Sequence, residues 1–80
     1  MKEELSKKEQ EVYEYLIRGL NYNQMEELLG IRKNTILTHA MHIFLKKMVS
    51  SRYELMAQRI NELEREVFNL QRTISNTRAN

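Results

Sequence analysis

Residues 21–42 read NYNQMEELLGIRKNTILTHAMH and predict two short helices joined by a tight turn at Leu29-Gly30-Ile31. Asn21 is a good N-terminal cap, and Gln24 follows three residues later, which is the spacing of a capping box. Gly30 lacks a Cβ atom, so it readily adopts the left-handed conformation that ends a helix. The expected apolar face of the first helix of the pair consists of Met25, Leu28 and Leu29.

The second helix of the pair is expected over about residues 33–47. Its buried stripe would consist of Ile36, Ala40 and Ile43. Two helices joined by a short turn that contains glycine form the helix-turn-helix motif, whose second helix lies in the major groove of DNA. The stretch therefore predicts a DNA-binding helix.

The rest of the chain also favours helices, since it has no proline and only two glycines. Ser6 and Glu9 have capping-box spacing and predict a helix ahead of the motif that ends at Gly19. The apolar face of this helix consists of Val12, Leu16 and Ile17. Its glutamates are expected to form a solvated face.

A seven-residue apolar repeat follows the capping-box pair Ser51 and Glu54. With β-branched residues at a positions and leucines at d positions, the repeat favours a parallel two-stranded coiled coil. We expect a helix-turn-helix domain over residues 1–51, a dimerisation helix over 52–76 and a frayed tail over 77–80. Pairing with a second copy, giving a homodimer, and pairing with another protein both fit the sequence. The expected interface residues are Tyr53, Met56, Ile60, Leu63, Val67, Leu70 and Ile74.

Length and composition limit the classes of function. The 80 residues, 41% of them hydrophobic, form one small domain that a partner or a second copy would help to stabilise. The sequence has no cysteine, no membrane-spanning apolar run and no secretory signal pattern, so we expect a cytoplasmic protein without membrane contact. It has no nucleophile beside a base and no glycine-rich phosphate loop, so we expect neither an enzyme nor a cofactor. His39 and His42 have a metal-compatible spacing but no further ligand nearby, so we expect no metal site and a structural role for His39.

Charge is unevenly distributed along the chain, although the net charge is only +2. Residues 1–27 contain seven acidic and four basic residues, whereas residues 28–53 contain five basic residues and no acidic one. The acid-free stretch coincides with the expected DNA-binding helix and the turn after it. This distribution predicts a phosphate-binding surface.

The exposed side of the helix over residues 33–47 supplies the expected DNA contacts. Leu37, Thr38 and Met41 project away from the buried stripe, where the two apolar side chains could touch thymine methyl groups or bind a protein instead. The phosphate contacts are expected from Lys33, Asn34, His42 and Lys46. The full set of expected contact residues is Arg32, Lys33, Asn34, Thr35, Leu37, Thr38, Met41, His42 and Lys46.

Five short motifs carry a resemblance to a known family. They are Leu5-Ser6-x-x-Glu9-x-Glu11-Val12, Gly19-Leu20-Asn21, Leu29-Gly30-Ile31, Thr35-Ile36-x-Thr38-His39 and Ser51-Arg52. From Leu5 to about Leu55 the chain resembles the LuxR/GerE type of helix-turn-helix domain. The resemblance implies four helices, dimerisation through the fourth helix, and a two-fold symmetric or direct-repeat site on double-stranded DNA.

The chain departs from the family pattern at several positions. Glu26 replaces a small alanine, so either the two helices of the motif cross differently or the carboxylate reaches solvent. Arg32 replaces a serine or threonine cap, Lys47 replaces an apolar residue, and the apolar repeat extends past the family's short fourth helix. We expect a dimeric, sequence-specific DNA-binding transcriptional regulator. The alternative is a protein-interaction module that binds a regulator or a polymerase subunit through Leu37 and Met41 or through the coiled coil.

Overall fold

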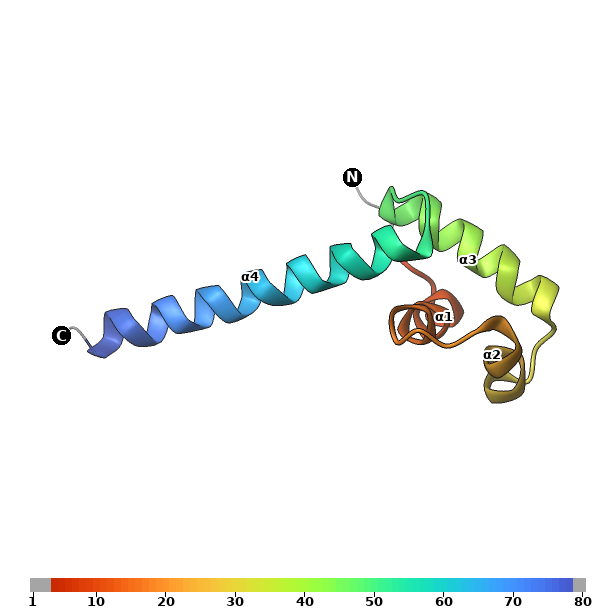
Figure 1. The fold of residues 1–80 in the computed structure, drawn as a ribbon, viewed down its shortest axis with the longest axis horizontal. Coiled ribbons are helices and arrows are strands. Elements are labelled where there is room, and N and C mark those ends of the chain that lie inside the picture. Colours follow the sequence, from red (N-terminus) through yellow and green to blue (C-terminus); the bar gives the residue numbers. More distant parts are fainter. Residues whose placement is uncertain (1–3, 79–80) are drawn as a thin grey trace.

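A computed structural model of the chain describes residues 4–78, and the side chains of residues 4–71. Its elements are α1 (Lys7–Ile17), α2 (Tyr22–Leu29), α3 (Lys33–Lys47) and α4 (Arg52–Arg78). All regular structure in this part of the chain is helical, which confirms the all-α, four-helix prediction (Figure 1). α4 continues to Arg78, past its expected end near residue 76, and residues 79–80 of the expected tail lie outside the described part.

The capping boxes predicted for α1 and α2 are both formed. The Ser6 hydroxyl accepts from the Glu9 amide at 3.2 Å, and the Glu9 carboxylate accepts from the Ser6 amide at 2.8 Å. Asn21 and Gln24 exchange the same two bonds at 2.8 and 2.9 Å. These bonds satisfy amide groups that the start of a helix leaves without a backbone partner. α2 ends at Gly30 with φ 66°, as its lack of a Cβ atom predicts.

The ends of α3 are less regular than those of α2. Arg32 precedes the helix and makes no side-chain cap, as expected from the replaced serine or threonine. At the other end Met48 has φ 59°, in the left-handed region where glycine is usual. The turn after α3 is closed by the Val49 amide, which donates to the Phe44 carbonyl at 2.9 Å. A bulky residue therefore occupies a position at which the backbone favours glycine.

The hydrophobic core draws on all four helices. Ile36, Ala40 and Ile43 are buried, as predicted for the inner stripe of α3. Leu28 differs from its prediction, since it is 60% exposed. Met25 points into the core, and Leu28 lies about 60° around the helix from it, on the side away from Leu29. The buried hydrophobic residues are Val12, Tyr13, Leu16, Met25, Ile36, Ala40, Ile43 and Leu55.

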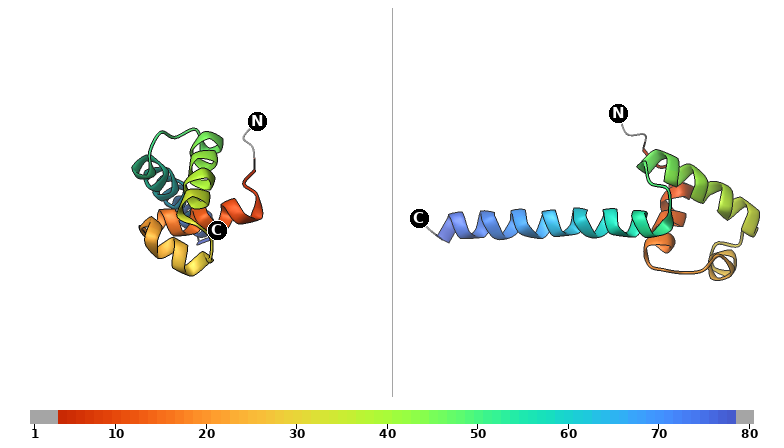
Figure 2. Two further views of the ribbon diagram at one scale, coloured as in Figure 1. Left: turned by 90° about the vertical axis from the view of Figure 1, so that its right-hand side faces the viewer. Right: turned by 45° about the horizontal axis from the view of Figure 1, so that its top comes forward.

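α4 touches the other helices only near its start. Among its described side chains Leu55 alone is buried. Beyond this contact α4 projects away from the cluster formed by α1, α2 and α3 (Figures 1 and 2). The principal extents of 56 × 27 × 21 Å reflect this projecting helix. Over its described residues α4 therefore does not fold back along the other three helices.

The capping box predicted at the start of α4 is only half formed. The Ser51 hydroxyl accepts from the Glu54 amide at 3.2 Å, as expected. The Glu54 carboxylate, however, accepts from the Ser50 amide at 2.6 Å and the Ser50 hydroxyl at 2.8 Å rather than from the Ser51 amide. Two donors are available one residue further back, and the carboxylate binds both. These bonds hold the pKa of Glu54 below its ordinary value.

Candidate nucleic-acid interface

The first half of α3 presents a mixed polar and apolar face to solvent. Asn34, Thr35 and Thr38 are exposed, and Leu37 and Met41 have exposed fractions of 37% and 64%. Leu37, Thr38 and Met41 were predicted to point away from the core, and the structure places them on one accessible surface with Asn34 and Thr35. The predicted DNA contacts of this part of α3 are therefore free of cover by the described residues of the same chain.

The Thr38 hydroxyl already uses its proton inside α3. It donates to the Asn34 carbonyl at 3.0 Å, a common bond for threonine within a helix. The hydroxyl oxygen keeps its acceptor lone pairs, which suit the amino groups of adenine or cytosine. A phosphate accepts only, so a bond from Thr38 to phosphate would first require the bond to Asn34 to open.

Two cations lie at the start of α3. Arg32 and Lys33 are both exposed, directly before and at the first residue of the helix. A guanidinium binds phosphate oxygens in pairs, and an ammonium binds them as a point charge. Arg32 and Lys33 therefore place positive charge beside Asn34 and Leu37.

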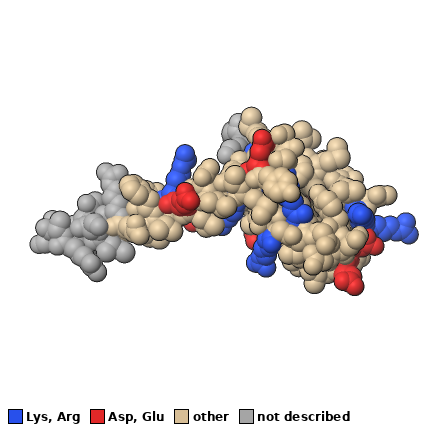
Figure 3. Space-filling model, viewed as in Figure 1, with Lys and Arg blue, Asp and Glu red and all other residues tan. Residues whose placement is uncertain are grey.

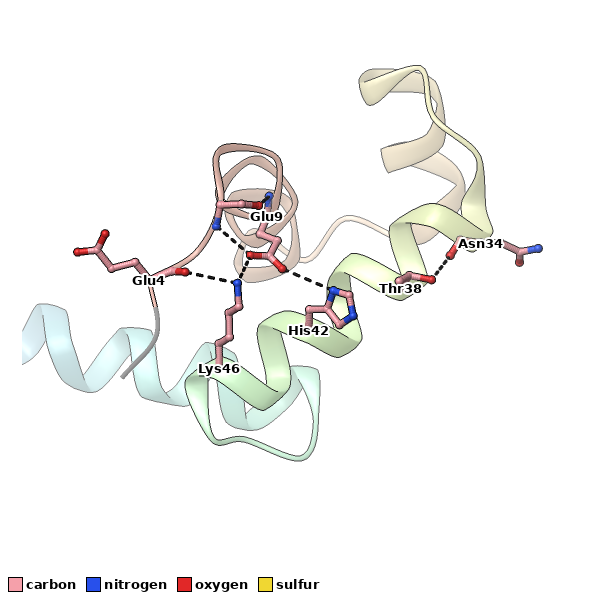
Figure 4. Close-up of polar contacts among 7 residues, drawn as sticks. Glu4, Glu9, Asn34, Thr38, His42 and Lys46 are labelled. Carbon is pink, nitrogen blue, oxygen red and sulfur yellow. Dashed lines mark hydrogen bonds and ion pairs between the residues drawn. The ribbon is translucent and has the colours of Figure 1, made fainter. Parts of the chain in front are cut away.

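Lys46 and His42, predicted to contact phosphate, both face α1 (Figure 4). The Lys46 ammonium lies 2.7 Å from a carboxylate oxygen of Glu9 and donates to the Glu4 carbonyl at 3.4 Å. His42 Nδ1 lies 3.7 Å from the other oxygen of Glu9, with its side chain 54% exposed. Lys46 is engaged within the protein, and a phosphate would compete with Glu9 for its ammonium. Its phosphate contact stays a prediction.

Glu9 contradicts the expectation that the glutamates of α1 form a solvated face. It is 4% exposed. The bond from Lys46 and then the bond from the Ser6 amide lower the pKa of Glu9 from 4.5 to about 2, against the opposing effect of burial. Sequence spacing identified Glu9 as a capping residue, but its position gave no sign of a partner 37 residues away.

Lys47 and Arg52 also turn toward the protein rather than outward. The Lys47 ammonium lies 5.1 Å from the ring centre of Tyr13, within cation–π range. The Arg52 guanidinium donates to the carbonyls of Leu16, Tyr15 and Leu20. This use of Arg52 was not predicted, because it depends on where α4 crosses the end of α1.

Three of the five basic residues of the acid-free stretch thus bind groups of the same chain. The other two, Arg32 and Lys33, are exposed, and both lie at the start of α3. On the face drawn in Figure 3, lysine and arginine side chains are scattered among acidic and uncharged residues. The distribution of charge along the sequence therefore overstated the basic character of the surface.

Comparison with protein families gives a match over most of the chain. A family described as bacterial regulatory proteins of the luxR family, GerE, matches residues 3–58. The chain belongs to this family. No curated protein and no solved structure matches the chain. The match confirms the resemblance found in the sequence motifs, and it makes the chain a DNA-binding regulator by family.

The GerE domain of this chain accommodates its unusual Glu26 without burying it. The side chain of Glu26 is exposed on α2, so the carboxylate reaches solvent, which is the second of the two outcomes considered from the sequence. Glu27 beside it is exposed as well. α2 therefore carries negative charge next to the turn that leads to Arg32.

α4 carries an apolar stripe, most of it beyond the matched GerE region, that the described residues do not cover. The exposed fractions of Ile60, Leu63, Val67 and Leu70 are 54%, 42%, 52% and 64%. Tyr53, at the start of the stripe, is 82% exposed, and Met56 is half-buried. The side chain of Ile74, the last predicted interface residue, lies outside the described side chains. The coiled coil itself stays a prediction.

The described residues offer neither a metal cluster nor a membrane helix. They contain no group of three or more histidine, cysteine, aspartate or glutamate side chains placed to hold a metal ion. None of the described helices combines the length and the apolar character that crossing a bilayer requires. His39 is half-buried in α3, and its structural role stays a prediction.

Proposed function

We propose that the protein is a dimeric, sequence-specific DNA-binding transcription regulator whose α3 enters the major groove. The observation that carries the proposal is the uncovered face of α3 in a domain of the GerE family. In a helix-turn-helix the first residues of the second helix reach the base edges. Here those residues are exposed and include donors, acceptors and apolar groups.

The side chains at the start of α3 divide between positioning and reading. Arg32, Lys33 and Thr35 hold the phosphate backbone, which fixes the register without reading sequence. Thr38 accepts from a base amino group, and Leu37 and Met41 contact thymine methyl groups. His42 and Lys46 stand further along α3, and their contribution to phosphate binding depends on release from Glu9.

The apolar stripe of α4 supplies the dimer. Exposed β-branched and leucine residues recur at seven-residue intervals, and a parallel two-stranded coil would cover them. Two copies related by a two-fold axis would then present two α3 helices to successive major grooves. Because the proposed function is DNA binding, we propose that the protein acts in the cytoplasm, where the chromosome lies.

A gel-shift titration against a pool of random duplexes tests the proposal. We expect binding at about 50 mM salt that weakens steeply by about 200 mM, because phosphate contacts release counterions. Lys33→Glu should weaken binding, whereas Lys8→Glu, a charge reversal beside Glu11 on α1, should not. Absence of binding to any duplex at the lower salt concentration would overturn the proposal.

A protein-interaction module is the second candidate, because exposed apolar residues run along α3 and continue just past its end. Leu45 and Met48 are 74% and 82% exposed, in addition to Leu37 and Met41. Residues near the far end of the helix are not needed to read bases, and large exposed apolar patches often bind proteins. Under this alternative, binding of the partner would be insensitive to Lys33→Glu and to salt, while Met41→Glu would abolish it.

A further inference from the structure

We propose that Arg52 is a positioning residue that fixes the angle between α4 and the helix-turn-helix, and thereby the half-site spacing that a dimer accepts. The inference rests on the proposed DNA-binding dimer. Arg52 is the first residue of α4, so any change in its contacts acts where the long helix leaves the domain.

The guanidinium of Arg52 binds three carbonyls where α1 ends. Nε donates to the Leu16 carbonyl at 3.0 Å, and Nη2 donates to the Tyr15 carbonyl at 3.4 Å and to the Leu20 carbonyl. The guanidinium carbon also lies 5.8 Å from the ring centre of Tyr22, the first residue of α2. One side chain of α4 thus joins the end of α1, the turn after it and the start of α2.

The position suits a cation. The carbonyls at the end of a helix carry the negative end of the helix dipole. The Leu16 and Tyr15 carbonyls already accept from the Gly19 and Leu20 amides at 3.2 Å, so the guanidinium is a further donor to oxygens that each have two lone pairs. The last turn of α1 contains no basic residue of its own, so Arg52 supplies the positive charge from another element. A guanidinium has a rigid planar set of donors that can serve several carbonyls at once, which a lysine ammonium at the end of a flexible stem cannot reproduce.

Two further residues complete the attachment of α4. Leu55 is fully buried, one turn along from Arg52. Gln58, a further turn along, donates to the Lys47 carbonyl at the end of α3 at 3.0 Å. Leu55 supplies apolar contact without direction, whereas the bonds of Arg52 and Gln58 are directional and join α4 to the ends of α1 and α3.

The length of α4 amplifies small changes at this attachment. Val67, in the apolar stripe of α4, lies 15 residues after Arg52, which is about 22 Å along the helix. A tilt of α4 by about 10° at Arg52 therefore displaces the stripe at Val67 by about 4 Å. In a dimer the pairing of the two α4 helices holds their apolar stripes in place, so the same tilt displaces each α3 instead. The displacement is comparable to the rise of about 3.4 Å per base pair, so the angle at Arg52 decides which spacing of half-sites the dimer fits.

The test combines a distance measurement with a spacing selection on the full chain. The protein lacks cysteine, so Asn23→Cys on α2 and Asn61→Cys on α4 can carry spin labels, diluted with unlabelled chain to report the distance within one molecule. We expect a narrow distribution in the parent and a broad one in Arg52→Lys. In duplexes with two half-sites and varied spacers, we expect the parent to prefer its best spacing by about tenfold or more, because a half-site out of reach forfeits bivalent binding.

Arg52→Lys should largely lose that preference while it keeps its dimer mass and its affinity for a single half-site. Arg65→Lys, the same substitution on the exposed part of α4, should leave both readouts unchanged. If Arg52→Lys does not fold, Gln58→Met serves as the second variant. It removes one directional bond together with a buried oxygen that has no hydrogen-bond partner among the described residues, so the fold should persist with a smaller broadening of the distance distribution.

The outcomes separate the inference from the proposed function. If folded Arg52→Lys has the same distance distribution and the same spacing preference as the parent, the positioning role of Arg52 is overturned, while the proposed DNA binding is unaffected. If the parent chain binds no duplex but Arg52→Lys still broadens the distance distribution between the labels, the proposed function and the spacing role are overturned together. Arg52 would then be a structural clamp only.

Discussion

Glu9 brings negative charge into the junction between α1 and α3, where the core leaves little water. A buried carboxylate is tolerated only when donors surround it. Here the Ser6 amide and the Lys46 ammonium supply them, and the His42 ring lies 3.7 Å from the other carboxylate oxygen. The same carboxylate closes the capping box of α1, so a single residue both starts a helix and attaches it to another.

The lowered pKa of Glu9 makes the free energy of unfolding depend on pH. Because the folded pKa lies below the ordinary value, the contribution of Glu9 is complete above about pH 4.5 and is lost as the pH falls toward about 2. The fall in pKa from 4.5 to about 2 corresponds to about 3 kcal/mol. Urea unfolding between pH 2 and 6 should show this slope in the parent, and Glu9→Gln should flatten it. Equal slopes in the two proteins would contradict the assignment.

Lys46 should matter more for stability than for DNA binding. Lys46→Gln leaves the Glu9 carboxylate without its cation, so we expect a loss of about 2 kcal/mol in the free energy of unfolding. The affinity for duplex should change little, since the ammonium lies on Glu9. Lys33→Gln provides the comparison, with weakened binding and unchanged stability. A larger loss of affinity in Lys46→Gln than in Lys33→Gln would show that DNA displaces Glu9.

Met48 holds a backbone conformation that suits glycine. Its φ is 59° and its side chain is 82% exposed. Met48→Gly should raise the free energy of unfolding by about 1 kcal/mol, because the left-handed conformation costs a residue with a Cβ atom about that much. Met48→Ala keeps the Cβ atom and should bring no such gain. Chemical denaturation of the parent and both variants measures their free energies of unfolding. A lower value for Met48→Gly than for the parent would contradict the prediction and indicate a packing role for the methionine.

At the level of helices, local sequence rules performed well where the cause is local. Capping at Ser6 and Asn21 and the turn at Gly30 depend on bonds within four residues, and the structure has all of them. The predicted burial of Leu28 was wrong, because three apolar residues on a short helix do not show which of them the neighbouring helices cover. The predicted bond from the Ser51 amide to the Glu54 carboxylate was also wrong, because two donors on Ser50 bind that carboxylate instead.

The seam of α4 can be tested by its effect on association. Leu63→Asp places a charge in the predicted seam, so we expect a monomer by sedimentation where the parent is a dimer. Circular dichroism should also show less helix, since an isolated helix of this kind is marginal in water. Asn61→Asp adds the same charge two residues earlier, off the seam, and should remain dimeric. A monomeric parent chain would refute self-pairing.

At the scale of the whole molecule, the candidate site was harder to predict than the fold. The acid-free stretch is a property of the sequence, but a phosphate-binding surface depends on where each side chain points. Lys46, Lys47 and Arg52 meet a carboxylate, an aromatic ring and helix-end carbonyls that other segments bring to them. The exposure of Leu37, Thr38 and Met41 was predicted correctly, because the apolar stripe of one helix is enough to define its opposite face. Their contacts with DNA stay predictions.

The small number of exposed cations on α3 makes two-site binding important for affinity. One domain offers Arg32 and Lys33 at the start of its α3, so a single half-site should be bound weakly. Linking two domains through α4 turns the second contact into an intramolecular one, which raises affinity by about 10²- to 10⁴-fold without a new contact. Leu63→Asp should therefore raise the Kd for a duplex with two half-sites by about that factor, while the Kd for one half-site stays unchanged. Titrations of both duplexes with parent and variant measure the difference, and equal losses on the two duplexes would mean that α4 contributes to folding rather than to linkage.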